Sequence, residues 1–259
     1  MTVFYLALAL RLIKVAQCVP GGHVLGVDVF APFPIIPLIV NRDVGHACGD
    51  SLLLHLRHQD VPRPTSLTGI TSLPFQHVRS RERVATQQSS TAHMQDPRAC
   101  TVTLFRGDAI HRSGDIDHPL DSSSSIPPFT TVLALDCAYH FASRETFLQQ
   151  SFARLAPGGR IALGDLVISH PLPFGLRTVL SRLLSVRSEN MITPGIYEGQ
   201  LKTIGYTNVR IEDISDNVFP GFCRFLQSRG GLWRVLAIII GAWERAGGRF
   251  LIVSATKPE

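Results

Sequence analysis

The 259-residue sequence lacks the patterns that several functional classes require. No stretch reaches the roughly 18 consecutive apolar residues of a membrane-spanning helix. The five cysteines are odd in number and widely spaced, with no CxxC pair, which argues against a disulfide scaffold or a zinc finger and favours a reducing compartment. The lysines and arginines are scattered, so the net charge of +5 does not predict a nucleic-acid surface. We therefore expect a cytoplasmic protein with no nucleic-acid partner and no metal site.

Apolar, strand-like runs alternate with helical segments along most of the chain. A hydrophobic content of 45% with 17% charged residues fits a globular protein. The expected strands are residues 35–40, 66–70, 101–105, 131–135, 160–168, 208–214 and 249–255. Such alternation predicts a doubly wound α/β sheet with helices on both faces.

The clearest unit runs from residue 131 to residue 168 and reads as strand, polar turn, amphipathic helix, turn and strand. Ser143 is expected to cap the helix, and Pro157 with the two glycines after it cannot continue the helix. Ligands of parallel sheets bind outside the carboxyl ends of the strands. The polar and aromatic cluster 136–141, DCAYHF, follows such an end and is a candidate site.

A second candidate site is the segment 43–51, DVGHACGDS, between an expected strand and an expected helix. Its small residues would let a ligand approach the backbone closely, although an ordinary strand–helix turn has the same composition. A dinucleotide fold would have glycine where Asp50 stands. It would also have an acid near the position of Thr71. Both departures argue against an NAD-dependent dehydrogenase.

Five motifs follow one another between about residue 40 and residue 168: DVGHACGD, GITSLPFQ, GDA, ALDCAYHF and LAPGGRIALGD. In this order and spacing they resemble class I S-adenosylmethionine-dependent methyltransferases. The nearest group contains ubiquinone, tocopherol and sterol methyltransferases and fungal secondary-metabolism enzymes. The resemblance implies a Rossmann-like, seven-stranded, mostly parallel sheet with an antiparallel last strand. It also implies a lead-in or lid over residues 1–34, a cofactor half over 35–168 and a substrate-side half over 169–259.

The resemblance further implies that S-adenosylmethionine is held at several strand ends. Its expected contacts are Asp43, Gly45, Ala47 and Gly49 at the methionine end, Thr71 near the ribose, Asp108 and Ala109 at the adenine, and Asp136, Cys137 and Ala138 near the transferred methyl group.

Methyl transfer from a sulfonium is an in-line displacement, so alignment supplies most of the catalysis. An oxygen or nitrogen nucleophile must still lose a proton. His140 is the best candidate base, because histidine normally titrates near neutrality. Tyr139 is the second candidate, as an orienting hydroxyl or as a ring beside the sulfonium. A structural role for His140, bonding a neighbouring loop, is an equally weighted alternative.

The sequence thus predicts methyl transfer to a small apolar or aromatic acceptor in specialised metabolism. One alternative places the same chemistry at a membrane surface, on a prenyl or sterol-like lipid, because the N-terminus is apolar and the apolar run 235–243 is flanked by Arg234. Another is a degenerate methyltransferase fold that only binds, since Asn41, Arg42 and Ala47 depart from the family pattern. The oligomeric state is left open.

Overall fold

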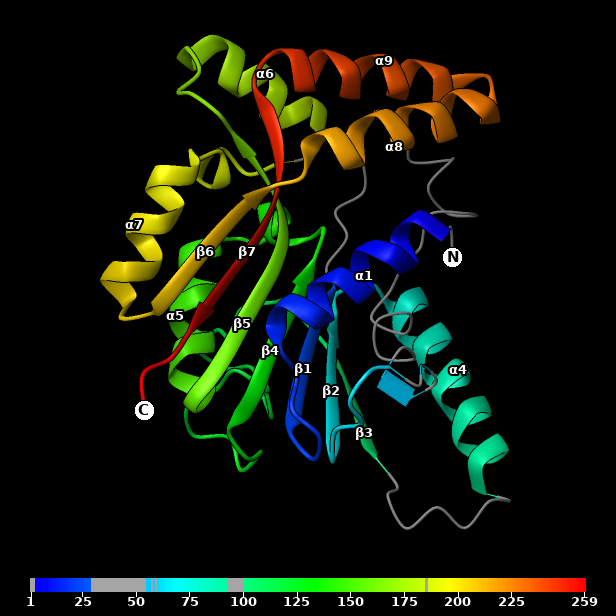
Figure 1. Cartoon of the computed structure of the whole chain (residues 1–259), viewed down its shortest axis with the longest axis vertical. Coiled ribbons are helices and arrows are strands. Elements are labelled where there is room, and N and C mark those ends of the chain that lie inside the picture. Colours follow the sequence, from blue (N-terminus) through cyan, green and yellow to red (C-terminus); the bar gives the residue numbers. More distant parts are fainter. Residues whose placement is uncertain (1–2, 29–54, 57, 59, 93–99, 185) are drawn as a thin grey trace.

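The structure is a computed structural model that describes residues 3–28, 55–56, 58, 60–92, 100–184 and 186–259. These residues form one seven-stranded sheet in the order β3-β2-β1-β4-β5-β7-β6 (Figure 1). The strands are β1 His23–Asp28, β2 Ser66–Thr71, β3 Thr101–Arg106, β4 Phe129–Leu135, β5 Leu155–Ile168, β6 Thr207–Asp213 and β7 Gly248–Thr256. β7 runs antiparallel to β5 and β6, and the other pairings are parallel. The predicted α/β sheet with an antiparallel last strand is confirmed.

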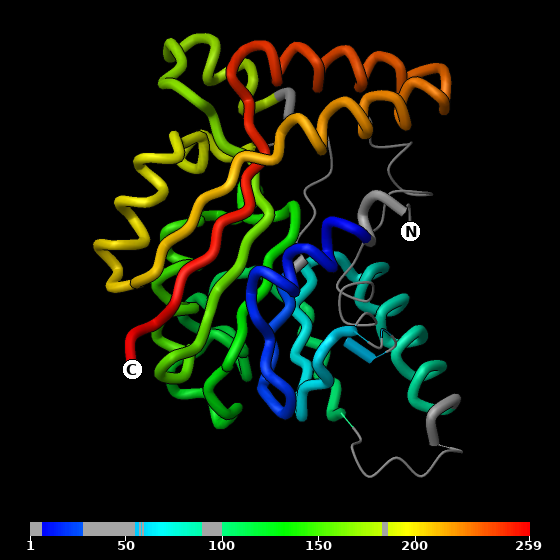
Figure 2. The backbone as a smooth tube through the Cα atoms, viewed as in Figure 1, coloured from blue at the N-terminus to red at the C-terminus, as the bar shows by residue number. Residues whose placement is uncertain are grey.

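Helices cover both faces of this sheet. They are α1 Val3–Ala16, α4 Pro74–Ala92, α5 Arg144–Arg154, α6 Phe174–Leu184, α7 Pro194–Ile204, α8 Ser215–Arg229 and α9 Leu232–Arg245, with short 3₁₀ turns η1 Ala138–His140 and η2 Ser188–Asn190. α1 crosses one face over β4 and β5, whereas α5 lies behind the sheet and packs on α7 (Figure 1). α6, α8 and α9 gather at one end of the sheet (Figure 2). Within the described residues, no helix combines the length and apolarity needed to cross a membrane.

Local sequence signals fix the boundaries of α5 and α7. The Ser143 hydroxyl accepts a hydrogen bond from the backbone N–H of Thr146 at 3.1 Å, so the predicted N-cap of α5 is confirmed. Thr193 caps α7 in the same way, with Pro194 at the first helical position. α7 ends at Gly205, whose φ of +111° is a conformation that favours glycine.

The first strand comes from a part of the chain that the sequence analysis set apart as a lead-in. β1 is His23–Asp28 and pairs with both β2 and β4, and α1 packs on the same sheet. The expected strand 35–40 lies outside the described residues. That run is the more apolar of the two and directly precedes the glycine-containing segment, so the local pattern favoured it. Pairing with two distant strands, rather than hydropathy, selects His23–Asp28.

The apolar region before β7 is divided into two helices, α8 and α9. Gly230 and Gly231 separate α8 from α9, and both have positive φ, at +72° and +51°. A residue with a Cβ atom is strained in that region, so the pair of glycines allows the chain to reverse there. The resulting hairpin brings α8 and α9 side by side at one end of the sheet (Figure 1).

We expect the free energy of unfolding to fall in mild acid because His55 is buried. Its Nδ1 lies 3.5 Å from the carbonyl oxygen of Pro62, and burial lowers the pKa of His55 to about 4. The unfolded chain takes up this proton near pH 6.5 and the folded chain does not, so stability is complete above that pH and decreases down to about pH 4. The loss should approach about 3 kcal/mol. It is measured as unfolding free energy against pH.

The matched variants for this test are His55→Gln and His170→Gln, the second at an exposed position. His55→Gln should flatten the acid limb of the curve, and His170→Gln should leave it unchanged. Parallel curves for His55→Gln and the parent would show that the protonated imidazole is accommodated in the folded state.

Candidate functional site

The order of the strands reverses at the centre of the sheet. From β1 the chain proceeds outward to β2 and β3, and later returns to place β4 on the other side of β1. Asp28 ends β1 opposite Thr71 of β2, and Val27 pairs with Ala134 of β4. The carboxyl ends of these three strands therefore meet at one edge. Ligands of open α/β sheets bind at such a reversal of strand order.

The loop after β4 carries the cluster that the sequence analysis singled out. Asp136 has a φ of +56°, and its N–H donates to the carbonyl of Gly164 at 2.7 Å. The hydroxyl of Tyr139 donates to Asp136 Oδ1 at 2.8 Å. The ring of His140 lies 4.1 Å from the ring of Tyr139, and both side chains are largely buried. The Sγ of Cys137 donates to the carbonyl of Val27, 3.4 Å away, which fastens the loop to β1. The predicted residues 136–140 therefore lie directly after β4, at the reversal of strand order.

Asn190 fixes the backbone of this loop and was not recognised from the sequence. Its Nδ2 lies 2.8, 3.2 and 3.5 Å from the carbonyl oxygens of Phe141, Tyr139 and Ala138. Its Oδ1 accepts from the backbone N–H of Arg144 at 3.0 Å. A buried amide that satisfies several carbonyls at once holds them in one arrangement. The contact spans 49 residues of sequence, so no local pattern points to it.

A buried ion pair lies behind the loop. Arg144 Nε is 2.7 Å from Asp165 Oδ2, and Arg144 also donates to the carbonyls of Asn190 and Leu166. The hydroxyl of Tyr197 donates to the same Asp165 oxygen at 3.0 Å. Burial raises the pKa of the Asp165 carboxyl, and the Arg144 guanidinium opposes that rise by favouring the carboxylate. The pair thus joins the start of α5 to β5 and α7.

The ends of β2 and β3 supply further polar groups at the same edge. The buried hydroxyl of Thr71 donates to Gln76 Oε1 at 3.0 Å, and the N–H of Gly107 donates to the Thr71 carbonyl. The carboxylate of Asp108 pairs with Arg112 at 2.7 Å, and Ala109 beside it is buried. The predicted residues Thr71, Asp108 and Ala109 therefore follow neighbouring strand ends. Gln76, the last residue of the motif GITSLPFQ, is a neighbour to which the sequence prediction gave no role.

Several hydrogen bonds anchor the segment after β3. The buried ring of His118 donates from Nε2 to the carbonyl of Asp108 at 3.1 Å and accepts the N–H of Leu120 at Nδ1. Burial lowers the pKa of His118, so the neutral ring that both bonds need is favoured. Arg154 donates to the carbonyls of Pro119 and Ile126. These bonds position Asp108.

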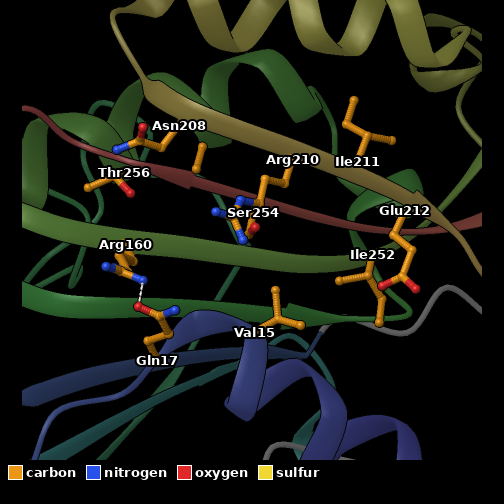
Figure 3. A pocket seen from close by; sticks show the side chains of 11 residues that line it. Val15, Gln17, Arg160, Asn208, Arg210, Ile211, Glu212, Ile252, Ser254 and Thr256 are labelled. Carbon is orange, nitrogen blue, oxygen red and sulfur yellow. Dashed lines mark hydrogen bonds between the residues drawn. The ribbon is translucent and has the colours of Figure 1, made fainter.

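A cavity of about 430 Å³ lies elsewhere, between the end of α1 and strands β5, β6 and β7 (Figure 3). Its side chains include Gln17 and Arg160, which are hydrogen-bonded to each other. The lining runs along β5, β6 and β7, from Arg160 and Thr256 to Glu212 and Ile252. None of the predicted site residues that the structure describes lines this cavity.

The described residues at these strand ends include groups suited to S-adenosylmethionine. Hydroxyl and amide oxygens at Thr71 and Gln76 can accept from ribose hydroxyls, and the carboxylate of Asp108 can accept from an amino group. The Asp136 carboxylate, held by Tyr139, suits a neighbouring positive charge. The expected contacts at the methionine end, Asp43, Gly45, Ala47 and Gly49, lie outside the described residues and stay predictions.

Comparison with known proteins gives relatives of one chemical class. No family model matches the chain. The chain is 26% identical over 189 residues to erythromycin 3''-O-methyltransferase of Saccharopolyspora erythraea, covering 68% of this chain and 53% of that protein. The chain thus spans about half the length of this curated relative. These matches confirm the predicted resemblance to small-molecule methyltransferases.

Solved structures share the fold at low sequence identity. Geranyl diphosphate C-methyltransferase from Streptomyces coelicolor, in complex with Mg²⁺, geranyl diphosphate and S-adenosylhomocysteine, has a TM-score of 0.68 at 10% identity and covers 97% of this chain and 78% of that one. The [4+2]-cyclase SpnF has a TM-score of 0.64 at 17% identity and covers 98% and 81%. A cyclase on the same fold shows that architecture alone does not establish methyl transfer.

Proposed function

We propose that the protein is an S-adenosylmethionine-dependent methyltransferase that acts on a hydroxyl group of a small apolar or aromatic molecule. The observation that carries the proposal is the meeting of Thr71, Asp108 and the Asp136–His140 loop at the reversal of strand order. The methyltransferase relatives support the reaction class, and the relative named for 3''-O-methylation supports an oxygen acceptor.

The residues of the loop have distinct tasks in this proposal. The bound cofactor supplies an activated methyl group on a positively charged sulfur. Asp136, whose carboxylate is held by the Tyr139 hydroxyl, stabilises that charge. His140 accepts the proton of the acceptor hydroxyl. Cys137 and Ala138 are fully buried and help exclude water from the reaction.

The acceptor side is assigned to the substrate-side half of the chain. α6 and α8 follow the carboxyl ends of β5 and β6, at the same edge of the sheet as the loop after β4. Their inner side chains include Val218 and Phe219, which are buried and apolar. An apolar or aromatic acceptor fits such surroundings. A peripheral contact with a membrane is a separate proposal about the outer face of these helices.

Titration calorimetry with S-adenosylhomocysteine tests the cofactor half of the proposal. We expect a dissociation constant within the range of about 1 μM to 1 mM that is usual for enzyme ligands. No heat at millimolar ligand would remove the methyltransferase interpretation. Binding without transfer of labelled methyl groups to any hydroxylated apolar acceptor in a panel would instead support a binding protein on this fold.

Replacing Asp108 by alanine should weaken that binding. The variant loses the carboxylate proposed to accept from the adenine amino group, and a hydrogen bond to a charged group contributes about 1.5–3 kcal/mol. We therefore expect a dissociation constant about 10- to 100-fold higher by calorimetry. Asp216→Ala, at an exposed position in the first turn of α8, is the matched control and should bind as the parent does. Equal affinities for all three proteins would show that Asp108 does not contact the cofactor.

A further inference from the structure

Helices α6, α8 and α9, called the cap below, carry an excess of positive charge. Their sequences contain six arginines and two acids, Asp216 and Glu244. The cap lies at one end of the molecule, where the tube shows the three helices together (Figure 2). This concentration is a large part of the net charge of +5 on the whole chain.

The outward side of α9 is apolar as well as positively charged. Leu236, Ile240 and Trp243 face inward and are buried. Val235 and Ile238 are 49% and 64% exposed, and they occupy the other side of the helix. Arg234 and Arg245 are exposed on that side too. An apolar stripe bordered by arginines is typical of helices that lie in a membrane interface.

α6 adds a second apolar group to the cap. Phe174 at its start is 86% exposed, which is unusual for a large aromatic side chain. Leu176 and Val179 on the same helix are also exposed, and Arg182 is exposed near its end. Within the described residues, more of the exposed large apolar side chains lie on α6 and α9 than in the rest of the structure.

We propose that the outer face of the cap docks on a membrane surface that contains anionic phospholipid. The apolar side chains of α6 and α9 would enter the boundary between headgroups and acyl chains, and the arginines would pair with lipid phosphates and carboxylates. Charge decides between this occupant and a second copy of the chain. A symmetric dimer through the cap would place the same arginines against each other, whereas an anionic membrane complements them.

The position of the cap would bring the membrane close to the proposed acceptor site. α6 and α8 follow the carboxyl ends of β5 and β6, which lie at the same edge of the sheet as the ends of β1, β2 and β4, so a membrane bound to the cap would lie near the edge proposed to bind the acceptor. The docking itself does not require cofactor or catalysis. Vesicle binding and methyl transfer can therefore fail independently.

Flotation of the full chain with vesicles tests the docking surface. We expect binding to phosphatidylcholine vesicles that contain about 30% phosphatidylserine, with little binding to pure phosphatidylcholine. Ile238→Glu should lower the partition coefficient at least about tenfold, because it places a like-charged carboxylate against the lipid and removes the apolar contact. Arg234→Gln should lower the partition coefficient about fivefold. Added salt should also lower it, because salt screens the attraction between the arginines and the lipid.

The matched control is Ile196→Glu on α7, where the parent side chain is 50% exposed and lies outside the cap. It should bind vesicles as the parent does. Equal loss in both glutamate variants, or no flotation of the parent with anionic vesicles, overturns the proposal. A parent dimer in light scattering that Ile238→Glu converts to a monomer, without vesicle binding, would identify a second copy as the occupant instead.

Discussion

Asp165→Asn should lower the free energy of unfolding by about 3–5 kcal/mol, the loss expected when one member of a buried ion pair is removed. The substitution keeps the shape of the side chain but leaves the Arg144 guanidinium buried without its counter-charge. It also exchanges the oxygen that accepts from Tyr197 for an uncharged amide. Chemical denaturation monitored by circular dichroism measures the change.

A surface ion pair provides the comparison. Lys202 and Glu198 form an exposed i,i+4 pair on α7, so Glu198→Gln should cost less than about 1 kcal/mol. The double variant Arg144→Met with Asp165→Leu removes both charges and should be much less unstable than Asp165→Asn. If Asp165→Asn costs no more than Glu198→Gln, Arg144 must reach water in the folded protein.

The fourth and fifth strands could be predicted because their signals are local. A serine cap and an amphipathic helix lie within a few residues of the boundaries that they determine. The predicted Pro-Gly-Gly turn is wrong in one respect: β5 begins at Leu155, so these residues lie at an irregularity within the strand. The first strand could not be predicted in this way. His23–Asp28 is short, and it is a strand because β2 and β4 pair with it on both sides. Such pairing over about 40 to 110 residues depends on the whole sheet.

The same difference between local and long-range signals separates the site residues that could be predicted from those that could not. Thr71, Asp108 and the loop from Asp136 follow strand ends, and a strand end is visible in a sequence as the point where an apolar run meets polar residues. Asn190 and Arg144 determine the shape of that loop through contacts 46 to 49 residues apart. Their hydrogen bonds exist only after β5 and α7 have packed, so their role could not be predicted.

His140→Gln should lower kcat for methyl transfer to a hydroxyl acceptor by about 10²- to 10⁴-fold, the range attributed to a general base. Glutamine retains a polar side chain of similar length but cannot take up the proton. S-adenosylhomocysteine should bind with nearly unchanged affinity, because the proposed cofactor contacts at Thr71 and Asp108 lie at the ends of other strands, β2 and β3. Single-turnover kinetics with labelled cofactor and calorimetry on the same preparation measure both quantities.

The two roles considered for His140 differ in which quantities change together. A base that acts only on the acceptor proton lowers kcat and leaves cofactor affinity and melting temperature near those of the parent. A histidine that merely holds the loop against its neighbours would change all three, because Asp136 and Tyr139 would lose their arrangement as well.

Tyr139→Phe calibrates the second pattern, since it removes only the hydroxyl bond to Asp136 and should cost about 1 kcal/mol in affinity or stability. A large fall in kcat for His140→Gln, with affinity and melting temperature changed less than in Tyr139→Phe, assigns the proton transfer to His140. Joint changes at least as large as those of Tyr139→Phe assign it a structural role.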